Sequence, residues 1–226
     1  MSAAAELARA PIAQTVAIVA RALAHRYGRA RGLERTDFEL SGPGVVAVTG
    51  VNGAGKSTLL RVLAGLLRPS DGDSEVRLDG QALSAAGRRR HIGYAAPDLA
   101  FYPEMSACEN LCFAAEARGM AEPQAAAHAA LARVGLASRA DDRAGALSSG
   151  MTQRLRIASA LLHRPSVLLL DEPGSHLDDA GRERLETVIA EAARTGLVLV
   201  ATNDEREWRL ARERIQLRGR GLGGPP

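Results

Sequence analysis

Residues 50–58 read Gly50-Val51-Asn52-Gly53-Ala54-Gly55-Lys56-Ser57-Thr58 and form a glycine-rich segment. The segment follows a β-branched run at 45–49, typical of a buried strand, and precedes leucines at helical spacing over 59–67. Glycines in such a loop let backbone N–H groups wrap phosphate oxygens, and the N-terminus of the following helix adds its positive dipole. A glycine-rich turn without a ligand is the alternative, but it does not require this flanking strand and helix. The pattern therefore predicts a phosphate-binding loop formed by all nine residues.

Lys56 is the only lysine in the chain, since the other 28 of its 29 basic residues are arginines. A position that keeps lysine in such a chain indicates a need for a compact ammonium, which a planar guanidinium cannot replace. In a phosphate-binding loop this ammonium reaches the β- and γ-phosphates of a nucleotide, and the hydroxyl of Ser57 ligates Mg²⁺. We therefore expect a nucleoside triphosphate and Mg²⁺ as ligands.

Two adjacent carboxylates, Asp171 and Glu172, follow the fully apolar run at 167–170. The C-terminal ends of buried strands are where ligands bind in open α/β sheets. Asp171 is suited to hold Mg²⁺, directly or through water, and Glu172 to polarise the water that attacks the γ-phosphate. Adjacent acids after a strand are often only the start of a solvated loop, but the phosphate-binding loop upstream favours the catalytic interpretation.

The rest of the chain alternates strand-like and helix-like segments. Loose apolar alternation predicts an antiparallel strand pair at 15–24 and 31–40, around Gly28. The alanine-rich block at 104–143, interrupted at Gly119 and Pro123, predicts a helical insertion. The alternation as a whole indicates an α/β fold with a parallel core. Its other expected elements are strands at 75–78, 92–95, 167–170 and 197–202, a turn at 70–72, and helices at 151–162 and 182–194.

Composition and charge exclude several classes of protein. The 226 residues carry a net charge of +3, from 29 basic and 26 acidic side chains, which is too small and too scattered to predict a nucleic-acid partner. Arg88, Arg89 and Arg90 form the sharpest basic run, and three arginines before a strand are more often a solvated edge than a binding site. The apolar stretch at 12–20 is shorter than the ~20 residues that span a bilayer, so we expect a cytoplasmic protein.

A third motif, Leu147-Ser148-Ser149-Gly150-Met151, lies 24 residues before Asp171. Together with the two nucleotide motifs it resembles the signature of ABC transporter ATP-binding subunits, and the resemblance spans residues 16–217. It implies a P-loop NTPase fold of the ABC-ATPase type. Such a fold has an N-terminal antiparallel β portion, a RecA-like parallel core and an inserted helical subdomain, here at about 98–160. We expect one such domain over residues 1–217 and a disordered tail at 218–226.

The resemblance also implies how the nucleotide sites are assembled. Ser148 and Gly150, with the start of the following helix, would offer donors to the γ-phosphate of ATP held by a second ATPase subunit. Two subunits, as a homodimer or a pair, would then close around two ATP molecules. Asp178 lies in a segment similar to the loop by which the two sites of the family communicate. Tyr27 stands where the family places an aromatic that stacks on adenine, and core packing is the alternative for this residue.

Several positions depart from the family pattern. Ser149 and Met151 stand where the signature has glycine and glutamine. Pro97 stands where the family has a glutamine that senses Mg²⁺, and the adjacent Asp98 is our candidate to replace it as a metal ligand. Asn203 stands where a histidine contacts the γ-phosphate, and an amide can donate a hydrogen bond but cannot take a charge. We therefore expect intact ATP binding and slower hydrolysis than in a site with glutamine and histidine.

The resemblance favours the ATP-binding and hydrolysing subunit of a transporter. Such a subunit would lie peripherally on the cytoplasmic face of the membrane and recruit separate integral membrane permease subunits through its helical block. The segment at 60–69 is similar to the haem-exporting cassette of cytochrome c maturation, which makes haem the candidate cargo. A soluble ABC-type ATPase acting on a cytosolic scaffold, as in iron–sulfur cluster assembly, is the alternative. A GTPase is excluded, because its Asn-Lys-x-Asp guanine reader needs a second lysine.

Overall fold

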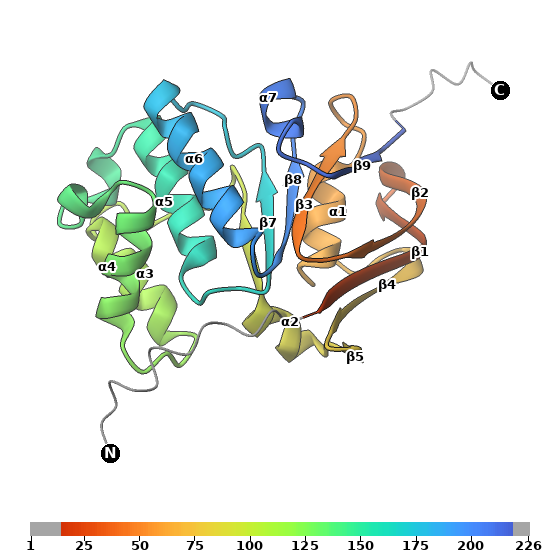
Figure 1. Ribbon diagram of the computed structural model, residues 1–226, viewed down its shortest axis with the longest axis horizontal. Helices are drawn as coiled ribbons and strands as arrows, with labels where there is room; N and C mark the ends of the chain where they lie inside the picture. Colours follow the sequence, from red (N-terminus) through yellow and green to blue (C-terminus); the bar gives the residue numbers. More distant parts are fainter. Residues whose placement is uncertain (1–14, 219–226) are drawn as a thin grey trace.

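The computed structural model describes residues 15–218, which fold around two β-sheets (Figure 1). The predicted tail lies, apart from Arg218, outside the described residues. The strands are β1 (Val16–Tyr27), β2 (Ala30–Ser41), β3 (Gly44–Thr49), β4 (Asp71–Leu78), β5 (Gln81–Ala82), β6 (Ile92–Ala95), β7 (Val167–Asp171), β8 (Leu197–Ala201) and β9 (Glu213–Gln216). One sheet has the order β2-β1-β4-β5, and the other has the order β6-β7-β8-β3-β9.

Helices cover both faces of the second sheet (Figure 1). Among residues 15–218, no helix is both long and apolar enough to cross a membrane. The helices are α1 (Lys56–Leu63), α2 (Ala85–His91), α3 (Ala107–Glu116), α4 (Pro123–Arg133), α5 (Ser149–Leu161), α6 (Asp179–Ala192) and α7 (Glu205–Trp208), with 3₁₀ turns η2 (Ala137–Arg139) and η3 (Ala144–Ala146).

The first sheet is antiparallel and is built on the predicted pairing of β1 with β2, which is confirmed. The other edge of β1 pairs with β4, which begins at Asp71. The turn predicted at 70–72 is therefore wrong in its last two residues. Aspartate and glycine disfavour strands, but here β1 supplies a pairing partner, and the Arg21 guanidinium lies 3.5 Å from Asp73 and 3.7 Å from Glu75. Tertiary pairing thus overrides the local preference.

The second sheet is fully parallel, as predicted, and separates two hydrophobic cores. Successive side chains of β7 and β8 point to opposite faces, as in any strand. One face packs against α1, which lies between the two sheets, and the other packs against the helices around α5. The core on the α1 side contains Leu169 and Leu199. The core on the α5 side contains Leu168, Leu170, Val198 and Val200.

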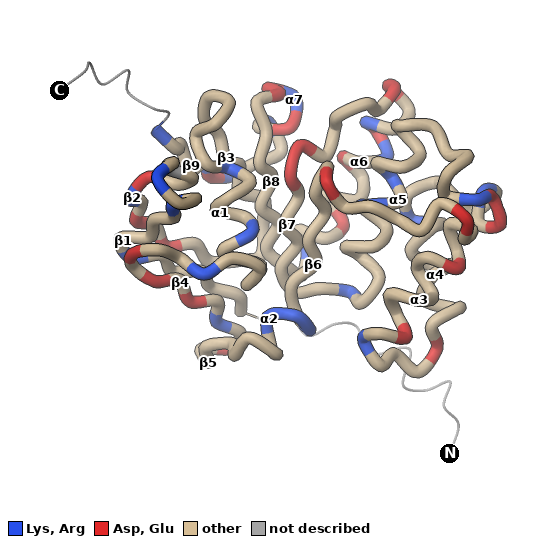
Figure 2. Tube along the Cα trace, turned by 180° about the vertical axis from the view of Figure 1, so that it is seen from behind, with Lys and Arg blue, Asp and Glu red and all other residues tan. Residues whose placement is uncertain are grey.

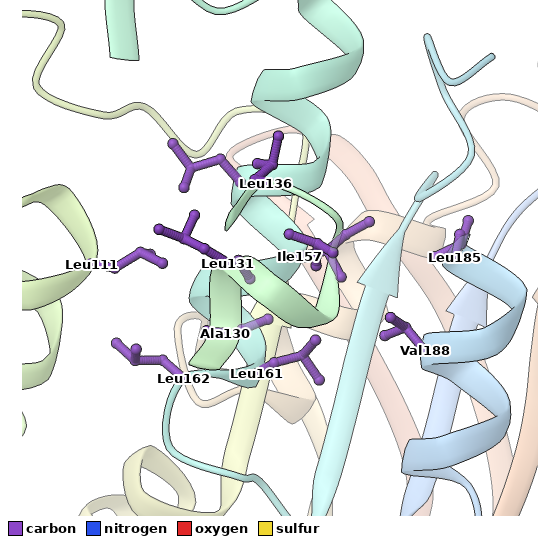
Figure 3. Close-up of a cluster of buried hydrophobic side chains, with 14 of the residues drawn as sticks. Leu111, Ala130, Leu131, Leu136, Ile157, Leu161, Leu162, Leu185 and Val188 are labelled. Carbon is purple, nitrogen blue, oxygen red and sulfur yellow. The ribbon is translucent and has the colours of Figure 1, made fainter. Parts of the chain in front are cut away.

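Helices α3, α4 and α5 form a helical lobe beside the parallel sheet, and small side chains let them approach closely (Figure 3). Gly119 lies between α3 and α4, and Pro123 is the first residue of α4, so the helical block is interrupted where predicted. Ser148 caps α5, which therefore begins at Ser149, before the predicted start at residue 151. Leucines from α3, α4 and α5 meet in this lobe, while Leu185 and Val188 of α6 reach the same core beside β7.

Four short elements are absent from the sequence-based prediction. They are β5, α2, α7 and β9. A helix as short as α2 or α7 has too few residues to show a periodic pattern. Within β9 only Ile215 is buried, and the strand exists because it pairs in parallel with β3. Such elements are defined by their neighbours rather than by their own composition.

The arginines at 88–90 lie on α2, and Arg88 differs from the solvated edge that we expected. Its guanidinium is half-buried and donates to the carbonyl oxygens of Val62 and Leu63 at the C-terminal end of α1, at 3.5 and 3.4 Å. It also donates to the carbonyl oxygen of Ser74 in β4. Arg88 therefore joins the end of α1 to the antiparallel sheet, where carbonyl groups at a helix end need donors.

Gly93 in β6 is a point of close approach between the parallel sheet and the helical lobe. A Cβ at this position would lie 2.1 Å from the carbonyl oxygen of Ala160 in α5 and 2.8 Å from the Pro165 ring. Backbone cannot yield as a flexible side chain does, so a methyl group here would force α5 away from the sheet.

We expect Gly93→Ala to lower the free energy of unfolding by about 2 kcal/mol or more, the usual scale of overpacking in a core. Urea denaturation would measure the loss. The control is Gly87→Ala on α2, where the nearest contact is the flexible Leu83 side chain at 3.3 Å, and where alanine favours a helix by up to about 1 kcal/mol. Equal stability of the two variants would contradict the close approach.

Candidate functional site

The predicted phosphate-binding loop lies between β3 and α1, at the C-terminal edge of the parallel sheet (Figure 1). Gly50, Gly53 and Gly55 have φ angles of +151°, +81° and +99°, a region that favours glycine. Gly55 also has no room for a side chain, because a Cβ there would lie 2.5 Å from the carbonyl oxygen of Gly32. The glycines thus turn the chain so that α1 begins directly at Lys56.

Lys56 lies at the centre of this site and is only 6% exposed. Its ammonium donates to the carbonyl oxygen of Gly50 at 2.7 Å and to Oδ1 of Asn203 at 3.1 Å. Burial lowers the pKa of Lys56, while the nearby carboxylates of Glu172 and Asp171 act in the opposite direction. The structure therefore brings together the phosphate loop, both predicted acidic residues and Asn203 around one cation.

Asp171 ends β7 and is 2% exposed. Burial raises the pKa of this carboxyl, and a hydrogen bond from the Ser57 hydroxyl partly offsets the effect. Its Oδ1 atom is buried without a hydrogen-bond partner among the described residues. A buried, unpaired oxygen beside a hydroxyl fits the hard oxygen ligands that Mg²⁺ prefers. Residues 15–218 contain no group of three His, Cys, Asp or Glu side chains that could hold a metal ion.

Glu172 follows Asp171 and is exposed, so its carboxylate can meet a ligand. Its φ angle of +48° is unusual for a residue with a side chain. The backbone N–H donates to the carbonyl oxygen of Ala201 at 2.8 Å, which fixes the chain to the end of β8. The bend directs the next residues away from the sheet, while the Glu172 side chain stays at the edge that carries Lys56.

Asn203 joins the end of β8 to the phosphate-binding loop. Its Nδ2 donates to Oδ1 of Asn52 at 2.7 Å, while its Oδ1 accepts from Lys56. Val51, Asn52 and Gly53 are exposed at the tip of the loop, and Ala54 is buried beneath them. An amide can make both contacts because it carries a donor and an acceptor. Asn203 thus lies at the site expected from the sequence.

Tyr27 lies at the end of β1, beside the start of α1, and is 44% exposed. Its hydroxyl lies 3.4 Å from Oγ1 of Thr58, and its ring makes an edge contact with His25, with centroids 4.6 Å apart. This exposure argues against core packing as its role. Thr58 itself is buried in α1. Stacking of Tyr27 on adenine stays a prediction.

Asp98 lies in the segment after β6, next to Pro97. Its Oδ2 accepts a hydrogen bond from the Arg61 guanidinium of α1 at 2.8 Å. The Asp98 carboxylate is close enough to Asp171 to raise its pKa slightly by repulsion. In this structure Asp98 thus has a cationic partner, and its role as a metal ligand stays a prediction.

The third motif forms the first turn of α5. Ser148 is exposed, and its Oγ accepts from the backbone N–H of Met151 at 3.2 Å. A Cβ at Gly150 would lie 2.8 Å from the carbonyl oxygen of His176, so the helix start packs on the loop that follows β7. Asp178 caps α6 at the end of that loop. Contacts of these residues with a second subunit stay predictions.

Two buried polar side chains beside the site were missed by the sequence analysis. Gln153 of α5 is 1% exposed. Glu207 of α7 is 6% exposed, and burial raises its pKa. Its carboxyl accepts hydrogen bonds from the Thr202 hydroxyl and from the backbone N–H of Gly174. Neither residue belongs to a motif that the sequence alone identifies, since a glutamine or glutamate on a helix is usually solvated.

Comparisons with known proteins agree with this geometry. The lipoprotein-releasing ATP-binding protein LolD of Chromohalobacter salexigens is 44% identical over 142 residues, which are 59% of this chain and 59% of LolD. The cytochrome c biogenesis ATP-binding export protein CcmA 2 of Cupriavidus metallidurans is 38% identical over 187 residues, 81% of this chain and 88% of that protein. The chain spans about three fifths of the length of LolD and of YxlF from Bacillus subtilis.

A solved structure and a family profile extend the comparison. The dimeric structure of MJ0796, a bacterial ABC transporter cassette, superposes with a TM-score of 0.77 at 26% identity and covers 89% of this chain and 94% of that one. The profile of the family described as ABC transporter matches residues 33–175. That range is more than half of the sequence and includes the phosphate-binding loop, the signature segment and the acidic pair, so the chain belongs to the ABC transporter family as an ATP-binding domain.

Proposed function

We propose that the chain is the ATP-hydrolysing subunit of an ABC transporter and that it works as a dimer closed around two ATP–Mg²⁺ complexes. The observation that carries the proposal is the convergence of Lys56, Asp171 and Glu172 at one edge of the parallel sheet. Phosphoryl transfer needs positioned charge more than covalent chemistry. These three side chains supply an ammonium, a buried oxygen ligand and an exposed carboxylate at one place.

Each side chain has a distinct task in this proposal. The backbone N–H groups of the loop and the Lys56 ammonium bind the β- and γ-phosphates, so Lys56 exchanges contacts that it now makes with Gly50 and Asn203. Ser57 and Asp171 would hold Mg²⁺, which when bound neutralises charge on the phosphate oxygens. Glu172 accepts a hydrogen bond from the attacking water and directs it at the γ-phosphate.

The dimer follows from the position of the signature segment. Ser148 is exposed at the start of α5, where its side chain caps the helix and its carbonyl oxygen accepts from the N–H of Thr152. The N-terminus of α5 is then a ready anion site, and a second subunit facing it would present the γ-phosphate of its ATP. The dimeric MJ0796 cassette, similar over 89% of this chain, supports this arrangement.

A groove beside α2 supports the proposed permease partner. The groove has a volume of about 590 Å³ and lies between the end of α1, α2, and the segment after α3. Figure 2 shows the basic run of α2 between the antiparallel sheet and the helical lobe. Burial lowers the pKa of His163 in this groove to about 4, so this side chain is neutral at neutral pH. The positive charge of the groove therefore comes from arginines. Arg89, Arg90, Arg118 and the exposed Leu66 line it, a combination suited to a short amphipathic segment with acidic residues.

We propose haem as the exported cargo. The chain itself would lie on the cytoplasmic face of the membrane. The support for haem is the similarity to CcmA 2, which extends over most of both proteins. LolD and the taurine import protein TauB of Mesorhizobium japonicum, 36% identical over 80% of this chain, are similar to a comparable degree. We therefore propose that membrane subunits select the cargo, so that their identity would decide between these cases.

Glu172→Gln should lower ATP turnover by roughly 100-fold or more, because the amide keeps the size of the side chain but no longer accepts a proton from water. ATP affinity should stay unchanged. Phosphate release and calorimetric titration with ATP–Mg²⁺ would measure the two quantities. Hydrolysis retained at the wild-type rate would place the water-polarising group elsewhere.

Asn203→His should raise turnover severalfold, because an imidazole can both donate to the γ-phosphate and take a charge. Asn203→Ala should lower turnover, since Lys56 and Asn52 lose a shared partner. Steady-state phosphate release at saturating ATP would rank the three proteins. A severalfold rise in Asn203→Ala would exclude Asn203 as a γ-phosphate contact.

The groove is tested by copurification from gently solubilised cells of the source organism, with Glu172→Gln, ATP and Mg²⁺ to hold the closed state. We expect a polytopic membrane protein, and we expect Arg89→Glu combined with Arg90→Glu to remove it. Arg184→Glu combined with Arg194→Glu, at exposed positions outside the groove, is the charge-matched control. Recovery of soluble scaffold proteins in place of a membrane protein would contradict the proposal that the chain is a transporter subunit.

A further inference from the structure

The backbone around Glu172 is held by the side chain of Gln153 from α5. Its Nε2 donates to the carbonyl oxygen of Glu172 at 3.3 Å and to that of Pro173 at 3.1 Å. Gln153 is almost fully buried, so water does not compete for these contacts. The amide group of Gln153 therefore hydrogen-bonds to two successive carbonyl groups of the loop that carries Glu172, the proposed water-polarising residue.

Arg156, one turn further along α5, fixes the orientation of that amide. Its Nη1 donates to Oε1 of Gln153 at 3.2 Å, so the amide oxygen faces Arg156 and the amide nitrogen faces the loop. The Nε of Arg156 donates to the carbonyl oxygen of Leu99 at 2.9 Å. A continuous hydrogen-bonded path thus runs from the segment after β6, through Arg156 and Gln153, to Glu172.

The path ends at a residue whose backbone needs support. A positive φ on a residue with a side chain costs of order 1–3 kcal/mol and persists only where its surroundings impose it. Glu172 has this conformation, and its N–H is already fixed by Ala201. Gln153 fixes the carbonyl on the other side, so the two contacts together set the direction in which the Glu172 side chain leaves the backbone.

We propose that Gln153 and Arg156 are positioning residues that aim the Glu172 carboxylate at the attacking water and couple its aim to the segment at 96–99. The inference rests on the proposed function of Glu172. A shift of that segment moves the Leu99 carbonyl, and the shift passes through Arg156 and Gln153 to the catalytic loop. The coupling needs no side-chain ligand at Pro97, because its first contact is a backbone carbonyl group.

The test compares turnover and ATP affinity in Gln153→Ala, Arg156→Ala and Arg156→Lys. We expect kcat to fall by about tenfold in the two alanine variants, the scale of a small misplacement of a catalytic group. The Kd for ATP–Mg²⁺ should stay within about twofold, since the phosphate-binding loop is untouched. Arg156→Lys should recover part of kcat, because an ammonium can still donate to Gln153.

Arg154→Ala is the matched control on the same helix. Its guanidinium donates to the carbonyl oxygen of Gly135 at 3.3 Å, away from the Glu172 loop, so kcat should not change. The double variant Gln153→Ala with Arg156→Ala should lose no more kcat than the larger single effect, because both residues act on one path. Additive losses, or a matching loss of ATP affinity, would overturn positioning in favour of general damage to the fold.

Glu172→Gln in the same assay distinguishes failure of the proposed role of Glu172 from failure of the proposed positioning by Gln153 and Arg156. If Glu172→Gln keeps wild-type turnover, the proposed role of Glu172 fails and the inference falls with it. If Glu172→Gln is inactive while Gln153→Ala and Arg156→Ala keep wild-type kcat, only the positioning path is overturned. Thermal unfolding of each variant identifies protein that has failed to fold. Arg156→Lys, which keeps the charge but loses the planar guanidinium, then carries the test: a lowered kcat with an unchanged Kd supports the path, and a wild-type kcat overturns it.

Discussion

The buried ammonium of Lys56 is the interaction on which the rest of the site depends. Removing a cation from water is unfavourable unless acceptors replace the lost hydration. The structure supplies a loop carbonyl at Gly50, the amide oxygen of Asn203 and two carboxylates at the end of β7. These acceptors come from three separate strands of one parallel sheet. The sheet order β7-β8-β3 is therefore what brings them within reach of one nitrogen atom.

Each charged group in the site also changes the electrostatic environment of its neighbours. Asp171 is buried enough to have its pKa raised, yet it lies in the field of Lys56 and shares a hydrogen bond with Ser57. The ammonium and the carboxylate thus lower each other's cost of burial, although neither is fully paired. One carboxylate oxygen has no partner among the described residues. An unpaired carboxylate oxygen of this kind is suited to bind the metal ion of a nucleotide complex, whose positive charge would compensate the buried carboxylate.

The sequence predicted those parts of the site that depend on local patterns. The phosphate-binding loop combines glycines, a strand and a helix within twenty residues, and Asp171 follows an apolar run that is typical of a buried strand. Gln153, Arg156 and Glu207 were not predicted, because their roles come from contacts with residues far away in the chain. The same reason applies to β9, which pairs in parallel with β3, and to the early start of β4.

The parallel sheet has one apolar core on each face, and on the face that carries the helical lobe one contact is made by backbone rather than by side chains. Hydrophobic contact is not directional, so the leucines hold α5 on the sheet without by themselves fixing where along the strands the helix lies. Gly93 supplies that fixed point, since the backbone of α5 at Ala160 lies directly on it. The position of the helix on the sheet therefore depends on the absence of a single methyl group. Ser148, at the other end of α5, takes its place relative to the sheet from that contact.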